Sequence, residues 1–204
     1  MKSSYLGNSP IEHLVLKGGF KLGKKRTLGL IVIISLVLMT LIFPYSFFSV
    51  YKPISFKADT IFLKDYRNEL NEFRNVNEQN ESSGRVEYYT DFILNTYEMD
   101  LMTADRVNVS KRDLNEMLDS IRSLRNLLLI MVFKEELSAE SKKYLDQSLR
   151  WCLLIEENIV RIKSFPYYTR FQLITLFKNL QNDVQMSFDM YTHFYEEYYG
   201  LIND

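Results

Sequence analysis

The chain of 204 residues contains a single cysteine, Cys152, so it cannot form an internal disulfide or the thiolate pairs of a usual structural zinc site. Glycine and proline are also scarce, with seven and four residues. This scarcity favours long uninterrupted helices over a sheet-rich fold. An unpaired cysteine outside the cell could bridge two copies of the chain. Free cysteine is more often a small buried apolar residue, which is the interpretation we favour for Cys152.

Patterns that carry catalysis or cofactor binding are lacking as well. The sequence has two histidines, no Glu-x-x-His motif of di-iron bundles, no Gly-x-Ser-x-Gly motif and no glycine-rich phosphate loop. His193 follows Asp189 by four residues and precedes Glu196 by three, so a carboxylate and the imidazole could share a helix face. A surface or half-buried histidine is the simpler interpretation. The sequence therefore predicts a protein that is not an enzyme and has no metal or other cofactor.

Charge is divided unevenly along the chain, although its net value is only −1. Six basic residues and one acidic residue lie at positions 1–26, whereas the rest of the chain carries 19 basic and 25 acidic residues. A basic head suits an anionic membrane surface, and a mildly acidic remainder argues against nucleic acid as a partner. The abundance of Ile, Asn, Lys, Phe and Tyr is typical of an AT-rich genome and favours a Gram-positive bacterium.

One long hydrophobic run is present. Residues 27–51 are uncharged, and residues 28–50 (LGLIVIISLVLMTLIFPYSFFSV) form its core. As a helix, these 23 residues extend about 35 Å, which is enough to cross a hydrocarbon layer of roughly 30 Å. A cleaved signal peptide would have a shorter run and a small-residue cleavage site, which this segment lacks. The sequence predicts one transmembrane signal-anchor helix at 28–50.

The charges that flank this run predict its orientation. The basic residues on the N-terminal side are Lys21, Lys24, Lys25 and Arg26, and only Lys52 and Lys57 follow closely on the other side. By the positive-inside rule, residues 1–27 form a cytoplasmic basic tail. Residues 51–204 then form an extracytoplasmic domain of a single-pass cell-membrane protein.

Apolar residues three and four apart predict helices through the rest of the chain. The expected ranges are 59–76, 85–107, 110–133, 138–164 and 169–199, with no convincing strand alternation. Ser110 and Asp113 resemble a capping box, and the apolar residues from Leu114 to Met131 have the heptad spacing of a bundle or coiled coil. Gly200 is a natural C-cap. The predicted fold class is all-α: the N-terminal transmembrane helix followed by an elongated antiparallel bundle of four to five helices.

Aromatic residues supply the candidate contact surface. In the segment 191–200 (YTHFYEEYYG), most rings continue the spacing of an expected buried seam, but two tyrosines lie outside that spacing. The candidate partner contacts are Tyr195 and Tyr199, followed by the weaker candidates Tyr88 and Tyr167. The apolar run 127–133 (LLLIMVF) is either buried or a surface for a partner, and we favour burial.

These observations favour a membrane-anchored, non-enzymatic interaction protein. A helical bundle at the outer face of the membrane would act as a subunit or regulator of an envelope protein complex, and would expose an apolar or aromatic patch. The alternative is an extracytoplasmic ligand-sensing bundle that signals through a separate membrane partner, which would show a convergent polar pocket. A third possibility is a homodimer through the seam from Leu114 to Met131. The expected partners are thus membrane lipid and either another membrane or envelope protein or a second copy of the chain.

Overall fold

The computed structural model describes residues 24–46, 53–79 and 85–201, which form seven helices and two short strands. Most of these residues are helical, which confirms the predicted helical class. The chain divides into two compact units, 1–37 and 38–204, with the boundary inside α1 (Lys24–Ile42). The second unit is called the body below.

The helix predicted at 28–50 is too long at its C-terminal end. α1 stops at Ile42, and residues 43–46 form a turn around Pro44, because proline disfavours helical geometry in the residue before it. Tyr45 is buried, and its hydroxyl donates to the carbonyl oxygen of Val109 at 2.8 Å, so this turn packs on the body. Residues 47–50 lie outside the described residues. Among the described residues, no helix combines the length and hydropathy required to cross a membrane.

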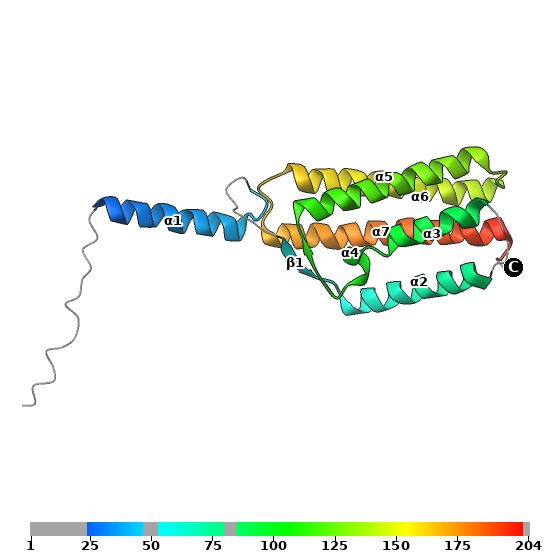
Figure 1. Ribbon diagram of the computed structural model, residues 1–204, viewed down its shortest axis with the longest axis horizontal. Helices are drawn as coiled ribbons and strands as arrows, with labels where there is room; N and C mark the ends of the chain where they lie inside the picture. Colours follow the sequence, from blue (N-terminus) through cyan, green and yellow to red (C-terminus); the bar gives the residue numbers. More distant parts are fainter. Residues whose placement is uncertain (1–23, 47–52, 80–84, 202–204) are drawn as a thin grey trace, which may run out of the picture. The chain divides into compact units, whose positions relative to one another are not determined.

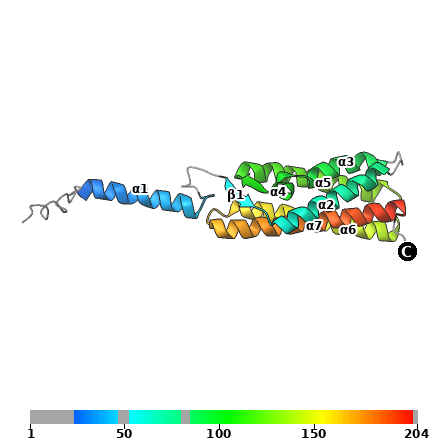
Figure 2. The same cartoon turned by 90° about the horizontal axis from the view of Figure 1, so that it is seen from below.

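Five helices and one short helical turn build the body. They are α2 (Thr60–Gln79), α3 (Arg85–Tyr97), the single turn α4 (Asp100–Thr103), α5 (Lys111–Lys134), α6 (Ala139–Ser164) and α7 (Arg170–Tyr199). Helices α5, α6 and α7 alternate in direction and are joined by short loops (Figures 1 and 2). α6 packs along both α5 and α7, which is the most extensive helix packing in the body. The predicted bundle of helices is confirmed.

Local capping sets the helix boundaries much as the sequence predicts. The Ser110 hydroxyl accepts from the backbone N–H of Asp113 at 3.2 Å, and the Asp113 carboxylate accepts from the N–H of Ser110 at 2.7 Å, which completes the capping box. Asp59 caps α2 by accepting from the N–H of Ile61 at 2.8 Å. At the other end of the body, Gly200 has a φ of 66° and ends α7 in the left-handed conformation.

The helix predicted at 85–107 is wrong in its second half, as is the absence of strands. After α3 and α4 the chain forms β2 (Arg106–Val109), which pairs antiparallel with β1 (Ile54–Lys57), Ile54 lying opposite Val109. In β1 the alternate residues Ile54 and Phe56 are buried, as expected for a strand with one covered face. The pairing partners lie about 50 residues apart, so local periodicity carries no signal for the pair.

The core is rich in buried aromatic rings whose hydroxyls have partners. The Tyr66 hydroxyl donates to the carbonyl oxygen of Tyr97 at 2.9 Å, and the Tyr97 hydroxyl lies 2.9 Å from Ser187 Oγ. The Tyr191 hydroxyl lies 2.7 Å from Thr90 Oγ1. A buried hydroxyl without a partner would cost about 1–3 kcal/mol, so these pairings fix how α2, α3 and α7 meet. Burial raises the pKa of Tyr66 and Tyr97 well above the ordinary tyrosine value, which keeps both hydroxyls protonated.

The heptad seam of α5 lies inside the body. Its members, Leu114, Met117, Ile121, Leu124, Leu128 and Met131, are all buried, as the spacing predicts. Because the seam packs against other helices of the same chain, it is not available for the homodimer considered above.

The connection between α6 and α7 contacts the end of α1. Arg170 Nε donates to the carbonyl oxygen of Leu41 at 3.0 Å, and the rings of Phe43 and Tyr167 meet edge to face at 6.3 Å. All four residues belong to the body unit, 38–204. Phe165 packs on Tyr168 at 4.6 Å within the connection. The turn that follows α1 and the α6–α7 connection therefore form one aromatic end of the body.

Candidate partner-binding groove

A groove of about 690 Å³ runs between α3 and α5. Its lining residues are Tyr88, Tyr89, Asp91, Phe92, Asn95, Ser123, Asn126 and Leu127. Tyr88 is 79% exposed and Phe92 46% exposed, and the rings of Tyr88 and Tyr89 meet at 5.5 Å. The groove therefore presents large aromatic side chains, which are enriched where proteins meet, beside carboxylate, amide and hydroxyl groups.

Helical geometry gives α3 two different faces. Val86, Ile93 and Tyr97 point into the core and are fully buried. Tyr88 and Phe92 are four residues apart and lie on the outer side, so they form a second stripe along the same helix. Within the described residues, neither Asp91 nor Asn95 makes a side-chain hydrogen bond, so these two polar groups of the groove are available to a partner.

The four tyrosines proposed as contacts have different positions in the structure. Tyr88 lines the groove, whereas Tyr167 is 51% exposed and lies in the α6–α7 connection. Tyr195 is fully buried, with its hydroxyl donating to Asn77 Oδ1 at 3.0 Å, so the expectation that it is exposed is wrong. Tyr199 is half-buried against the Tyr195 ring at 4.6 Å. The structure therefore does not bring the four together, and it leaves Tyr88 and Tyr167 as exposed candidates.

Tyr195 was misassigned because the buried side of α7 is wider than a heptad seam. Tyr195 lies one helical turn after Tyr191, so both rings lie on the same side of the helix. The Phe73 ring of α2 meets both, at 5.0 Å from Tyr195 and 5.9 Å from Tyr191. A helix covered by two neighbours buries a broad stripe, and the sequence does not say how many neighbours a helix has.

Phe92 is an apolar residue of α3, but its ring faces the groove. The spacing of Tyr88, Phe92 and Asn95 at i, i+4 and i+7 could have suggested a second face. The run 127–133 is also split: Leu128 and Met131 are buried as favoured, whereas Phe133 is 83% exposed. Each of these outcomes depends on which sides of α3 and α5 the other helices cover.

A second cavity, of about 350 Å³, lies between α2 and α7 and is acidic. Glu69 and Glu72 line it from α2, and Asp189, His193 and Glu196 line it from α7. His193 is half-exposed, with Nδ1 3.5 Å from Glu196 Oε2, as its sequence neighbours indicated. Burial and the nearby Glu69 carboxylate raise the pKa of Asp189 to about 6, partly offset by His193. Within the described part of the chain, no group of three or more side chains is arranged to hold a metal ion.

Replacing Asp189 with asparagine is expected to stabilise the body above pH 6. The folded state binds the Asp189 proton more tightly than the unfolded chain does, so wild-type stability falls as pH rises from about 4 to about 6 and is then constant. A two-unit shift, discounted because the side chain is half-exposed, corresponds to about 1 kcal/mol, or roughly 2–4 °C in Tm.

Thermal unfolding of Asp189→Asn at pH 8 and pH 4 measures the effect. The gain should vanish at pH 4, and the exposed control Asp65→Asn should show none. An equal gain at both pH values would contradict the prediction.

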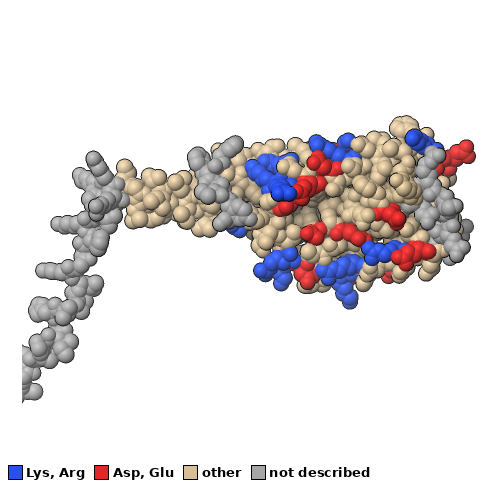
Figure 3. Space-filling view, in the orientation of Figure 1, with Lys and Arg blue, Asp and Glu red and all other residues tan. Residues whose placement is uncertain are grey.

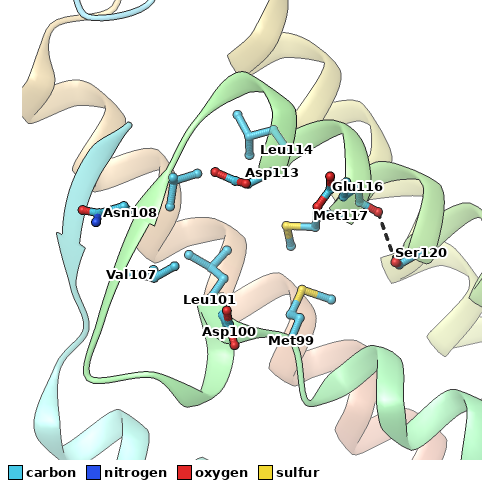
Figure 4. A pocket seen from close by; sticks show the side chains of 11 residues that line it. Met99, Asp100, Leu101, Val107, Asn108, Asp113, Leu114, Glu116, Met117 and Ser120 are labelled. Atoms are coloured by element: carbon cyan, nitrogen blue, oxygen red, sulfur yellow. Dashed lines mark hydrogen bonds between the residues drawn. The ribbon is translucent and has the colours of Figure 1, made fainter. Parts of the chain in front are cut away.

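A third cavity, of about 270 Å³, lies between α4, β2 and the first turns of α5 (Figure 4). Three acidic residues line it, Asp100, Asp113 and Glu116, and the last two already have structural partners. Asp113 belongs to the capping box, and Glu116 accepts from Arg112 Nε at 2.8 Å. The Ser120 hydroxyl donates to the backbone carbonyl of Glu116 at 3.1 Å. These contacts stabilise the start of α5.

Cys152 is buried, as the sequence favoured. Burial raises the pKa of its thiol to about 12, with a smaller opposing effect from a hydrogen bond with Ser187 Oγ at 3.4 Å. The thiol is therefore protonated and inaccessible at neutral pH, which makes it a core residue rather than a reactive group.

The basic residues predicted to set membrane topology are not placed. Lys21 lies outside the described residues, as do the side chains of Lys24, Lys25 and Arg26, so their role stays a prediction.

Comparison of the chain with models of known protein families, with curated proteins and with solved structures gives no match.

Proposed function

We propose that the protein is a membrane-anchored interaction protein of the bacterial cell envelope, which holds a protein partner in the groove between α3 and α5. It is a subunit or regulator of an envelope complex and has no catalytic role of its own. The observation that carries the proposal is the uncovered apolar surface of α1. The groove between α3 and α5 supports the second part of the proposal, that the partner is a protein.

The support for anchoring comes from the exposed fractions along α1. Twelve large apolar side chains between Leu28 and Ile42 are each 39–65% exposed, and they occur at nearly every position. A helix that is apolar on all sides requires an apolar environment, either a protein core or lipid. From Thr27 to Ile42, α1 contains no Lys, Arg, Asp or Glu, and this part of the helix is tan in Figure 3. We propose that lipid is this environment and that the cluster at 24–26 lies at the cytoplasmic surface, which directs the body outward.

The support for a protein partner comes from the contrast between the groove and the rest of the body. Acidic and basic side chains are interspersed over the face of the body seen in Figure 3, without a large field of one sign. Against this mixed surface, Tyr88 and Phe92 are large exposed rings beside unpaired polar groups. Tyrosine-rich patches of this kind contain the residues that dominate binding energy at interfaces. Anchoring both proteins in one membrane raises their effective concentration, so a groove of this size suffices.

The experiment attaches a membrane-impermeant maleimide that carries a benzophenone to Tyr88→Cys on intact protoplasts. The buried Cys152 thiol stays unlabelled. We expect labelling before lysis, because the body lies outside, and a discrete crosslinked protein after illumination, because the groove holds a partner. Adding Phe92→Ala should weaken the crosslink about fivefold or more, as truncation of a central aromatic contact does.

The matched control is Ile61→Cys on α2, where the native side chain is 71% exposed but lies away from the groove. This variant should label equally well and capture no discrete protein. Labelling of either variant only after lysis would reverse the proposed orientation. Equal crosslinking from both positions, or none from Tyr88→Cys, would remove the groove as the binding site.

The second candidate function is extracytoplasmic ligand sensing through a separate membrane partner. The acidic cavity between α2 and α7 favours it, because Glu69, Asp189 and Glu196 converge there and would attract a cationic ligand. A polyamine or amino sugar that raises the Tm of the wild type, but not of Asp189→Asn, would favour sensing over the interaction proposal.

A further inference from the structure

The segment that joins α6 to α7 contains an unusual concentration of exposed aromatic side chains. Residues 165–171 (FPYYTRF) comprise this segment and the first two residues of α7, and are called the aromatic connection below. They include Phe165 at 46%, Tyr167 at 51% and Phe171 at 78% exposure. Three exposed rings within seven residues are unfavourable on a surface that faces water, since each leaves a large apolar area exposed. The aromatic connection therefore requires an occupant, and its neighbours indicate which one.

The first indication is the contact with the end of the apolar helix. The Arg170 guanidinium donates to the carbonyl oxygen of Leu41 at 3.0 Å, and the Tyr167 ring meets that of Phe43. Leu41 lies in the last turn of α1, so the aromatic connection lies at the level where α1 ends. This inference rests on the proposed function, because it takes α1 as the membrane anchor.

The second indication is the length of the anchor. The part of α1 without a charge, residues 27–42, extends about 24 Å, whereas the hydrocarbon layer is about 30 Å thick. A span that is too short draws its flanking residues toward the bilayer. The flanking residues at this end are Phe43 and the aromatic connection, which would therefore meet the headgroup region, where Tyr and other aromatic residues collect.

The third indication is charge. Between Glu157 and Asp183 the chain has no acidic residue, although residues 51–204 as a whole are acidic. The basic residues in this interval are Arg161, Lys163, Arg170 and Lys178. Arg161 and Lys163 lie in the last turn of α6, directly before the aromatic connection. A basic segment beside exposed rings is complementary to anionic lipid headgroups.

We propose that the aromatic connection is an interfacial membrane anchor, which inserts Phe165, Tyr167 and Phe171 among the lipid headgroups beside the end of α1. The occupant is the surface of the bilayer that α1 crosses. A chain held at two places on the membrane is restrained in tilt, whereas one held by a single helix pivots freely. The groove between α3 and α5 is then presented at a fixed height above the membrane.

The experiment measures fluorescence quenching by brominated lipids in vesicles of phosphatidylcholine and phosphatidylglycerol that contain the full chain. Trp151, the one native tryptophan, is replaced by phenylalanine, and single tryptophans are introduced as Phe171→Trp, Phe133→Trp and Ile34→Trp. Phe171 and Phe133 are matched in exposure, at 78% and 83%, but Phe133 lies at the far end of α5, about 33 Å from the capping box at Ser110. Both positions tolerate tryptophan because neither is packed in the core.

Bromines near the headgroups should remove roughly half of the emission of Phe171→Trp and leave that of Phe133→Trp unchanged. Bromines deeper in the chains should quench Ile34→Trp. Quenching of Ile34→Trp without quenching of Phe171→Trp would overturn the interfacial anchor and leave the proposed transmembrane helix intact. Absence of quenching at both Ile34→Trp and Phe171→Trp would overturn the proposed transmembrane helix as well. Equal quenching of Phe133→Trp and Phe171→Trp would show that the whole body lies on the membrane, which also contradicts the proposal.

Discussion

Replacing Ile33 and Val37 with aspartate should release the protein from the membrane. The two native side chains are 60% and 52% exposed near the middle of α1, so neither substitution disturbs the body. A charged residue at the centre of a spanning helix costs about 2.5–3.5 kcal/mol, and two such residues on one face cost about twice that. Alkaline carbonate extraction followed by sedimentation measures the effect. Wild-type protein should stay in the membrane pellet, and the doubly substituted protein should move to the supernatant.

The matched control for this experiment replaces the same two residues with leucine. Ile33→Leu with Val37→Leu keeps the apolar surface and should remain in the pellet. Extraction of the wild type by carbonate would show that α1 does not cross the bilayer, and so would retention of the aspartate variant. Either result would leave the fold of the body unaffected, because the body has its own core, which is built by residues outside α1.

Truncation of Phe188 to alanine should be the most destabilising single change in the body. The Phe188 ring is 1% exposed and meets the rings of Tyr66, Phe73 and Tyr97 at 5.8, 5.6 and 5.1 Å. It therefore joins α7 to both α2 and α3. Removal of a buried phenylalanine ring costs about 3–5 kcal/mol, through lost burial and the cavity that remains. Because the total stability of a domain is about 5–15 kcal/mol, we expect the Tm to fall by about 10 °C or more.

Thermal unfolding in mild detergent, followed by circular dichroism, measures this difference. Phe133→Ala is the control, because it removes the same ring from a position that is 83% exposed, and its Tm should remain within about 2 °C of the wild type. A similar fall in Tm for both variants would mean that the exposed fraction of a ring in the structure does not indicate how much the ring contributes to stability. A negligible loss for Phe188→Ala would contradict the aromatic core at the junction of α2, α3 and α7.

Sequence reasoning succeeded where the relevant information lies within one or two helical turns. The apolar spacing from Leu114 to Met131 and the side chains of Ser110, Ser138 and Thr169 predicted α5 and the starts of α6 and α7. Caps and periodicity act over three to seven residues, so they can be read without knowing the neighbours of a helix. The buried Cys152 was also predicted, because the spacing of α6 places it on the core side.

The predictions were wrong where contacts with a distant segment decide the local structure or the burial of a side chain. Residues 104–109, which follow α4, are not helical. Here β2 pairs with β1, and Arg67 of α2 binds the carbonyl oxygen of Thr103 at 2.9 Å and the carboxylate of Asp105. Tyr195 is buried because α2 covers a second side of α7. The candidate site was predicted only in part. Tyr88 was named as a weaker candidate contact, but its groove requires α3 and α5 to lie side by side.

The helical class of the chain, most of its helix ends and the apolar character of residues 28–42 follow from hydrogen bonding and side-chain spacing within a segment, so they could be predicted without a structure. Tertiary packing decided which aromatic rings are buried and which face the solvent. It also brought Arg170 to the end of α1, across about 130 residues of chain. Burial could not be predicted locally because it depends on what packs against a surface. In this protein, the surfaces that pack together come from distant parts of the chain.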